Sequence, residues 1–123
     1  MSWVDGSSST CRTLRGGILK PHKSISLAGA DRTNIVLTDE DLENLKLAKK
    51  YGVTGIMQPF VQSGDDLLQL REILKQRDLG ELKIYAKLEN MEGVKALGEI
   101  IPYADEIVIA RGDLGNSMPL WKL

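Results

Sequence analysis

The sequence predicts an α/β fold in which three parallel strands alternate with helices. From Thr38 onward, stretches with apolar residues at helical spacing alternate with short runs rich in branched residues. The centres of these runs, near Ile56, Ile84 and Val108, lie roughly 25 residues apart, which is the spacing of consecutive βα units. By itself this alternation fits both a closed barrel and an open, doubly wound sheet.

The first helix is expected to begin after Thr38. A hydroxyl side chain is a favoured N-cap, and the acidic residues 39–41 follow in the first turn, where negative charge is stabilising. Leucines at positions 42, 45 and 47 continue the helical spacing. The basic pair 49–50 and then Gly52 are expected to close the helix.

The remaining elements follow in the same order. Ser63 is expected to cap a second helix that ends at Gly80, with an apolar stripe formed by Leu67, Leu70, Ile73 and Leu74. The predicted strands are 53–60, 82–88 and 106–110, and a short helix is predicted over 94–101.

The amino-terminal part has a different pattern. Residues 2–37 carry Gly, Ser, Pro and short apolar pieces, which are typical of short strands and turns. We therefore divide the chain into a β-rich segment, 1–29, and an α/β segment, 30–123. Three parallel strands leave an edge on each side, so we expect roughly three-eighths of an eight-stranded barrel, dependent on further strands for its stability.

Composition limits the partners of this chain. Of its 123 residues, 42% are hydrophobic and 27% charged, and 16 basic against 17 acidic residues give a net charge of −1. This balance predicts neither a nucleic-acid partner nor an anionic membrane. No apolar run approaches the roughly 20 residues of a membrane span, so we expect a cytoplasmic protein. Cys11 is the single cysteine, which excludes an intrachain disulfide.

Charged side chains gather where the second and third predicted strands end. Strand side chains alternate, so Lys87 and Glu89 are expected on one face and Leu88 on the other. Asp113 follows the next strand, and neighbouring strands lie about 4.8 Å apart, so Asp113 and Glu89 could share one divalent ion. Magnesium commonly takes one or two carboxylates and completes its shell with water and phosphate.

Each motif alone also has an ordinary structural interpretation. A Lys-x-Glu at a strand end is often a solvated pair, and Arg-Gly-Asp is often only a turn. Their occurrence together on adjacent strands favours a functional site. Asn90 and Glu92 are expected to cap the following helix, and His22, in a basic turn-like cluster, is expected on the surface.

Two stretches carry a family resemblance. Ile84-Tyr85-Ala86-Lys87-Leu88-Glu89-Asn90-Met91-Glu92-Gly93-Val94 resembles the active-site signature of pyruvate kinases, and Ile107-Val108-Ile109-Ala110-Arg111-Gly112-Asp113-Leu114-Gly115 resembles the strand and metal loop that follow it in that family. The segments 37–41 and 60–61 resemble the family's barrel helix and strand. Residues 12–29 are similar to the last part of its β-rich lid domain.

The resemblance implies a partial (β/α)8 TIM barrel from a glycolytic phosphotransferase that converts phosphoenolpyruvate and ADP into pyruvate and ATP. Lys87 would be catalytic, stabilising the transferring phosphoryl group and the enolate oxygen. Glu89 and Asp113 would hold Mg²⁺ or Mn²⁺. The substrate-binding positions would be Phe60, Ala110, Arg111 and Gly112. For the full-length protein the family also implies K⁺ as a cofactor and a homotetramer, and the isolated chain is expected to be inactive.

This sequence departs from the family pattern at two places. Gln58-Pro59-Phe60 stands where the family usually has Ala-Ser-Phe, which removes a hydroxyl and a backbone donor. Asn116-Ser117 replaces a usual hydrophobic–acidic pair after the metal loop. Two alternatives therefore stay open: a magnesium-dependent aldolase or lyase acting on the pyruvate enolate, disfavoured by Lys87 in its signature context, and a non-catalytic pyruvate kinase homologue.

Overall fold

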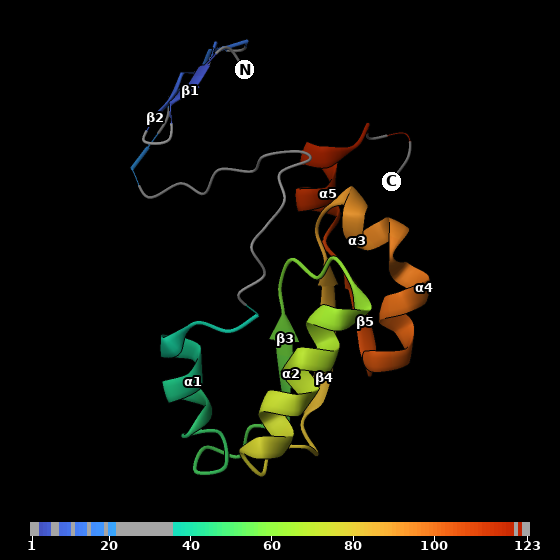
Figure 1. The fold of residues 1–123 in the computed structure, drawn as a ribbon. Helices are drawn as coiled ribbons and strands as arrows, with labels where there is room; N and C mark the ends of the chain where they lie inside the picture. Colours follow the sequence, from blue (N-terminus) through green and yellow to red (C-terminus); the bar gives the residue numbers. More distant parts are fainter. Residues whose placement is uncertain are drawn as a thin grey trace.

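The computed structural model describes residues 3–5, 8–10, 12–14, 16–18, 20–21, 36–119 and 121. Figure 1 shows the α/β part as a small sheet with helices packed against it. The elements are, in order, β1 (Trp3–Asp5), β2 (Ser8–Thr10), α1 (Asp39–Leu45), β3 (Gly55–Gln58), α2 (Gly64–Gln76), β4 (Lys83–Leu88), α3 (Met91–Lys95), α4 (Leu97–Ile100), the 3-10 turn η1 (Ile101–Tyr103), β5 (Glu106–Ile109) and α5 (Arg111–Ser117).

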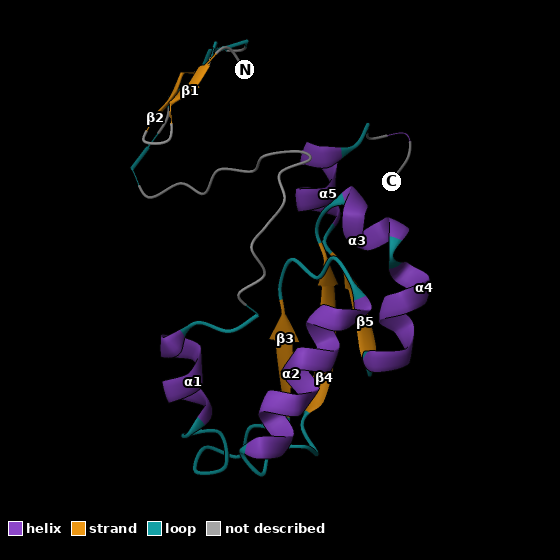
Figure 2. Ribbon diagram, viewed as in Figure 1, coloured by secondary structure: helices purple, strands orange, loops and turns teal. Residues whose placement is uncertain are grey.

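The central sheet is parallel, with the strand order β3-β4-β5. Ile56 lies opposite Ile84 on β4, and Lys87 of β4 lies opposite Val108. Along the chain a helix follows each strand of this sheet, and Figure 2 shows these helices in purple beside the orange strands. The predicted fold class, a partial α/β barrel with consecutive parallel βα units, is therefore confirmed.

The core lies between one face of this sheet and the helices α2 and α4. On β4 the burial alternates, with every second side chain buried from Ile84 to Leu88 and those between them partly exposed, as the strand parity predicts. Helix α2 contributes its buried leucines to the same cluster. The largest fully enclosed side chains are Leu67, Leu70, Leu74, Ile84, Ile100 and Val61.

The predicted N-caps of α1 and α2 are both confirmed. Thr38 and Ser63 each form a capping box, in which the hydroxyl accepts from the backbone of the third helical residue, Asp41 or Asp66, and that residue's carboxylate accepts from the cap's own N–H. These side chains satisfy N–H groups that have no acceptor inside the helix. Sequence-local chemistry is thus sufficient to place both helix starts.

The helix ends differ from the prediction. Helix α1 ends at Leu45. The chain then continues in turns, most of whose backbone hydrogen bonds join residues three apart, until Gly52, whose φ of 65° is left-handed. These turns bring Ala48 into the core, where it is 5% exposed. Helix α2 ends at Gln76, and the left-handed Asp78 (φ 58°) reverses the chain before Gly80.

The third predicted helix is divided into short pieces. Helix α3 begins at Met91 because the Asn90 side chain accepts from the N–H of Gly93 at 2.9 Å, which confirms the predicted cap. The helix breaks at Ala96, which has ψ near 8°, and η1 follows α4 with Pro102 in its first turn. The continuous helix expected over 94–101 is therefore wrong, and the cap explains the earlier start.

A polar clamp ties α2 to the sheet at the amino ends of β4 and β5. Asp105 accepts from the N–H of Ile84 and from the Arg71 guanidinium, both at 2.8 Å. Arg71 also donates to the backbone oxygen of Tyr103 at 2.9 Å. These hydrogen bonds lie at the end of the sheet opposite the charged residues that follow β4 and β5.

In the amino-terminal segment, β1 and β2 form an antiparallel pair. Residues 16–18 carry no strand. Cys11, His22 and the expected boundary between residues 29 and 30 lie outside the described residues. Among the helices that the structure does describe, none has the length and apolar character required to cross a membrane.

Candidate active site

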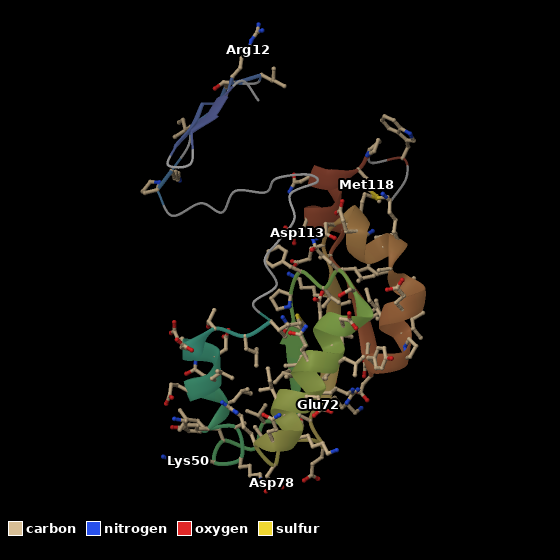
Figure 3. All side chains as sticks on the ribbon, in the orientation of Figure 1. Arg12, Lys50, Glu72, Asp78, Asp113 and Met118 are labelled. Carbon is tan, nitrogen blue, oxygen red and sulfur yellow. The ribbon has the colours of Figure 1, made fainter. Side chains whose placement is uncertain are left out.

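The candidate site lies where β4 and β5 end at the carboxyl edge of the sheet. β4 ends at Leu88, so Glu89 is the first residue beyond it, and β5 passes through Ala110 into helix α5. Figure 3 labels Asp113 on α5, at the upper end of the sheet in that view. The carboxyl ends of parallel strands are where barrel enzymes place their functional groups.

The structure brings Lys87, Glu89 and Asp113 together. The Lys87 ammonium lies 2.5 Å from a carboxylate oxygen of Glu89 and 3.8 Å from a carboxylate oxygen of Asp113. The Lys87 side chain is 29% exposed, that of Glu89 3% and that of Asp113 56%. Glu89 is therefore a buried carboxylate and Asp113 a solvent-exposed one, and the Lys87 ammonium contacts both.

Glu89 is held on both of its oxygens. Oε1 accepts from Lys87, and Oε2 accepts from the backbone N–H of Phe60 at 2.8 Å. Phe60 follows β3 and has a φ of 55°, so its backbone is left-handed. Such donors compensate a carboxylate for the loss of water on burial. The site thus draws on the ends of all three parallel strands.

The neighbouring carboxylates raise the pKa of Lys87. The hydrogen bond to Glu89 is the main cause that raises the pKa of Lys87 above its ordinary 10.5, opposed by desolvation and assisted by the negative charges of Glu89 and Asp113. The ammonium is charged throughout the neutral range, as a lysine of ordinary pKa would also be, and the shift extends that range upward. A permanent cation at this position suits binding to anionic groups rather than proton transfer.

The donor set fits a hard divalent cation of the magnesium type. Glu89 and Asp113 converge on one cationic position, and the described residues contain no group of three or more His, Cys, Asp or Glu side chains that would form a complete protein cage. Two carboxylates with open positions match Mg²⁺, which retains water and substrate oxygens in its shell. They do not match a closed tetrahedral zinc site.

The backbone positions predicted to bind substrate lie beside this cluster, but they differ in their hydrogen bonding. Ala110 donates its N–H to the Leu88 oxygen at 3.0 Å, and its own oxygen accepts from Asp113 and Leu114. Arg111 and Gly112 are the first two residues of α5, where N–H groups have no acceptor within the helix. Ala110 thus anchors the turn, and the next two residues present donors.

Sequence reasoning missed the Phe60 N–H as a partner of Glu89. The residues are 29 positions apart, and a backbone donor leaves no trace in residue type. The left-handed φ of Phe60 is equally hidden, because such a conformation is uncommon outside Gly, Asn and Asp. Pro59 directly precedes Phe60, so the departure from the family pattern lies one residue from this contact.

Comparison with known proteins shows which family this chain is similar to. A family model described as the barrel domain of pyruvate kinase matches residues 2–123. Pyruvate kinase 1 of Saccharomyces cerevisiae is 34% identical over 116 residues, which cover 94% of this chain and 23% of that protein. The pyruvate kinase of Geobacillus stearothermophilus is 36% identical over 106 residues, 86% of this chain and 18% of that protein. The chain thus spans about a quarter or less of the length of these relatives, and it belongs to the pyruvate kinase family.

Proposed function

We propose that this chain carries the phosphoryl-transfer edge of an enzyme that converts phosphoenolpyruvate and ADP into pyruvate and ATP. The observation that carries the proposal is the Lys87 ammonium between the Glu89 and Asp113 carboxylates at the ends of adjacent parallel strands. Phosphoryl transfer depends on positioning and charge neutralisation, and this cluster provides both a fixed cation and a carboxylate pair suited to a metal.

In the proposed reaction, the bond between the enol oxygen of phosphoenolpyruvate and phosphorus breaks, and a terminal oxygen of the ADP β-phosphate forms the new bond to phosphorus. The departing enolate then takes up one proton to become pyruvate. Lys87 would stabilise the phosphoryl oxygens and the enolate oxygen as negative charge moves between them. Its position between the two carboxylates supports this role, because it places a full positive charge at the ends of adjacent strands.

Glu89 and Asp113 would hold Mg²⁺ or Mn²⁺ beside Lys87. When bound, the metal would supply charge neutralisation for the phosphoryl and carboxylate oxygens of the substrate. The burial of Glu89 and its two donors would keep that carboxylate in a fixed orientation. Asp113 is half exposed and would adjust to the incoming substrate.

The substrate carboxylate would bind at the start of α5. Arg111 and Gly112 would donate their backbone N–H groups, and Ala110 would hold the turn in place through its bond to Leu88. The Phe60 ring, whose residue is 44% exposed, would form the neighbouring wall beyond β3. These assignments follow the family resemblance position by position.

The remaining proposals concern the whole protein. The family supports a cytoplasmic, glycolytic enzyme that binds ATP and ADP, uses K⁺ as a further cofactor and assembles as a homotetramer. It also supports residues 1–29 as the end of the lid domain and 30–123 as the partial barrel. The isolated 123-residue chain would be inactive, since the aligned region covers only 23% and 18% of the length of these two relatives.

A second candidate is a non-catalytic member of the same family. Pro59 favours it, because proline at the end of β3 has no N–H to offer a ligand and no hydroxyl. The third interpretation, a magnesium-dependent aldolase or lyase, would use the same carboxylates without needing a lysine between them.

A coupled assay of the full-length gene product separates these candidates. Pyruvate should form from phosphoenolpyruvate only when both ADP and a divalent cation are present, with ATP formed in equal amount. A protein that binds phosphoenolpyruvate but forms no pyruvate would be the non-catalytic homologue. Cleavage or condensation of a pyruvate-containing substrate without any need for ADP would instead identify the aldolase or lyase.

A further inference from the structure

The buried carboxylate of Glu89 depends on a backbone donor from another strand. Glu89 and Asp66 are the buried charged side chains among the described residues. Lys87, one of the two donors to Glu89, faces the reacting groups in the proposed function. The Phe60 N–H, 2.8 Å from Oε2, is therefore the contact that can fix Glu89 independently of substrate.

The position of that N–H is set by the loop after β3. Phe60 has a φ of 55°, a conformation that a bulky residue adopts only when its surroundings impose it. The next residue, Val61, is 1% exposed and donates its N–H to the Lys87 oxygen at 3.4 Å. The loop is thus held against β4 immediately beside the Phe60–Glu89 contact.

The Val61 carbonyl rests in the space that a side chain at position 93 would fill. A Cβ placed on Gly93 would lie 2.3 Å from the Val61 oxygen and 3.3 Å from a methyl carbon of Leu88. The Val61 oxygen could not move easily, because it belongs to a backbone segment that is held by β4. Gly93 is itself fixed, since its N–H donates to the Asn90 side chain at 2.9 Å.

We infer that Gly93 is a positioning residue for the Glu89 carboxylate. The missing side chain lets the Val61 carbonyl pack against the first turn of α3, and this packing holds the Phe60 N–H on Glu89. A side chain at position 93 would push the loop outward, draw the N–H away from Oε2 and leave Glu89 held by Lys87 alone. The inference rests on the proposed function, in which Glu89 is a metal ligand.

The test compares two glycine-to-alanine variants of the full-length protein by Mn²⁺ binding, followed through the electron paramagnetic resonance signal of the free ion. Gly93→Ala should raise the Mn²⁺ dissociation constant roughly 10- to 100-fold, the usual effect of losing a partner that orients a metal ligand. Gly98→Ala is the matched control, because Gly98 is also helical and a Cβ there would meet nothing within 4 Å. It should bind Mn²⁺ as the parent does.

The dissociation constant separates positioning from general damage. Loss of folded protein lowers the number of binding sites, whereas a misplaced Glu89 changes the midpoint of the titration. If Gly93→Ala does not fold, Asn90→Ala should give a smaller rise in the same constant, because it releases Gly93 from its cap. An unchanged midpoint in every folded variant, with the parent binding Mn²⁺, would overturn the inference and leave the proposed function intact. A parent that binds no Mn²⁺ would overturn the proposed function itself.

Discussion

At the scale of single residues, the proposed function gives Lys87 and the two carboxylates beside it separable roles. Lys87→Met removes the cation that lies 2.5 Å from Glu89 and 3.8 Å from Asp113. We expect turnover to fall by roughly 10²-fold or more, because the charge is needed most as the phosphoryl group moves. Metal binding should remain largely intact, since both carboxylates are retained. Steady-state kinetics and a metal titration of the full-length protein measure the two quantities.

A matched control for that variant lies on the same strand. Lys83→Met makes the same chemical change at the other end of β4, where Lys83 is exposed and lies 3.9 Å from Glu106. It should leave turnover within about twofold, since exposed ion pairs contribute little. If extra metal restored the activity of Lys87→Met, the assigned role of Lys87 would be wrong.

The carboxylate variants should have the opposite profile. Glu89→Gln or Asp113→Asn should raise the magnesium concentration needed for half-maximal activity, with partial recovery at high Mg²⁺ or with Mn²⁺. Recovery should be poorer for Glu89→Gln, because both Glu89 oxygens accept hydrogen bonds and an amide nitrogen would face a donor. A magnesium titration of turnover checks both, and an unchanged magnesium requirement in either variant would remove that residue from the metal site.

At the scale of elements, the clamp at the amino ends of β4 and β5 joins α2 to the sheet. The backbone N–H of Ile84 is the first cause that lowers the pKa of Asp105 below 3.8, followed by the hydrogen bond from Arg71. A carboxyl group whose folded pKa is lowered stabilises the fold above its unfolded pKa, and this contribution is lost as pH falls through the folded pKa. The clamp should therefore stabilise the fold at neutral pH, and its contribution to the free energy of unfolding should be lost in acid.

Asp105→Ala tests this clamp. We expect the variant to lose roughly 1–2 kcal/mol of unfolding free energy at pH 7, because Ile84 and Arg71 lose a charged acceptor. The difference from the parent should be constant from about pH 5 to 8 and should shrink below about pH 4. Chemical denaturation across this pH range measures it, with the exposed Glu81→Gln as the control. A difference that grew in acid would contradict the assigned direction.

At the scale of the whole molecule, the sheet is open on both sides. Within the described part of the chain, β3 and β5 each pair with β4 alone. Met57 on β3 is 55% exposed and Ile109 on β5 is 63% exposed. A cavity of about 450 Å³ also lies between β3, α1 and the turns that follow α1, and most of the residues that line it are apolar. These are the surfaces that further strands of a barrel would cover.

We therefore expect the isolated 123-residue chain to be marginally stable and inactive. Unpaired strand edges and exposed apolar side chains reduce the surface buried on folding, and the aligned region covers only 23% and 18% of two pyruvate kinases that the chain matches. Thermal unfolding followed by circular dichroism, together with the coupled pyruvate assay on the same sample, checks both properties. Robust turnover by this chain alone would contradict the expectation.

The sequence by itself determined the order of the helices and strands from residue 38 onward and the three charged residues that the structure brings together. Capping residues placed the starts of α1 and α2, because a cap acts on N–H groups only two or three residues away. Strand parity put Lys87 on the face opposite Leu88, and spacing brought Asp113 to the end of the next strand. Such inferences succeed because they depend on local geometry that is repeated in every helix and strand.

Only the tertiary structure decided how the site is held. The Phe60 N–H reaches Glu89 across 29 residues, Asp105 bonds to Arg71 across 34, and the Val61 carbonyl occupies the space beside Gly93. It also decided that α1 ends at Leu45 and that the third helix breaks at Ala96. These features arise from backbone atoms and close contacts between distant segments, which residue types and their spacing do not encode, because the packing of the whole sheet and its helices brings them together.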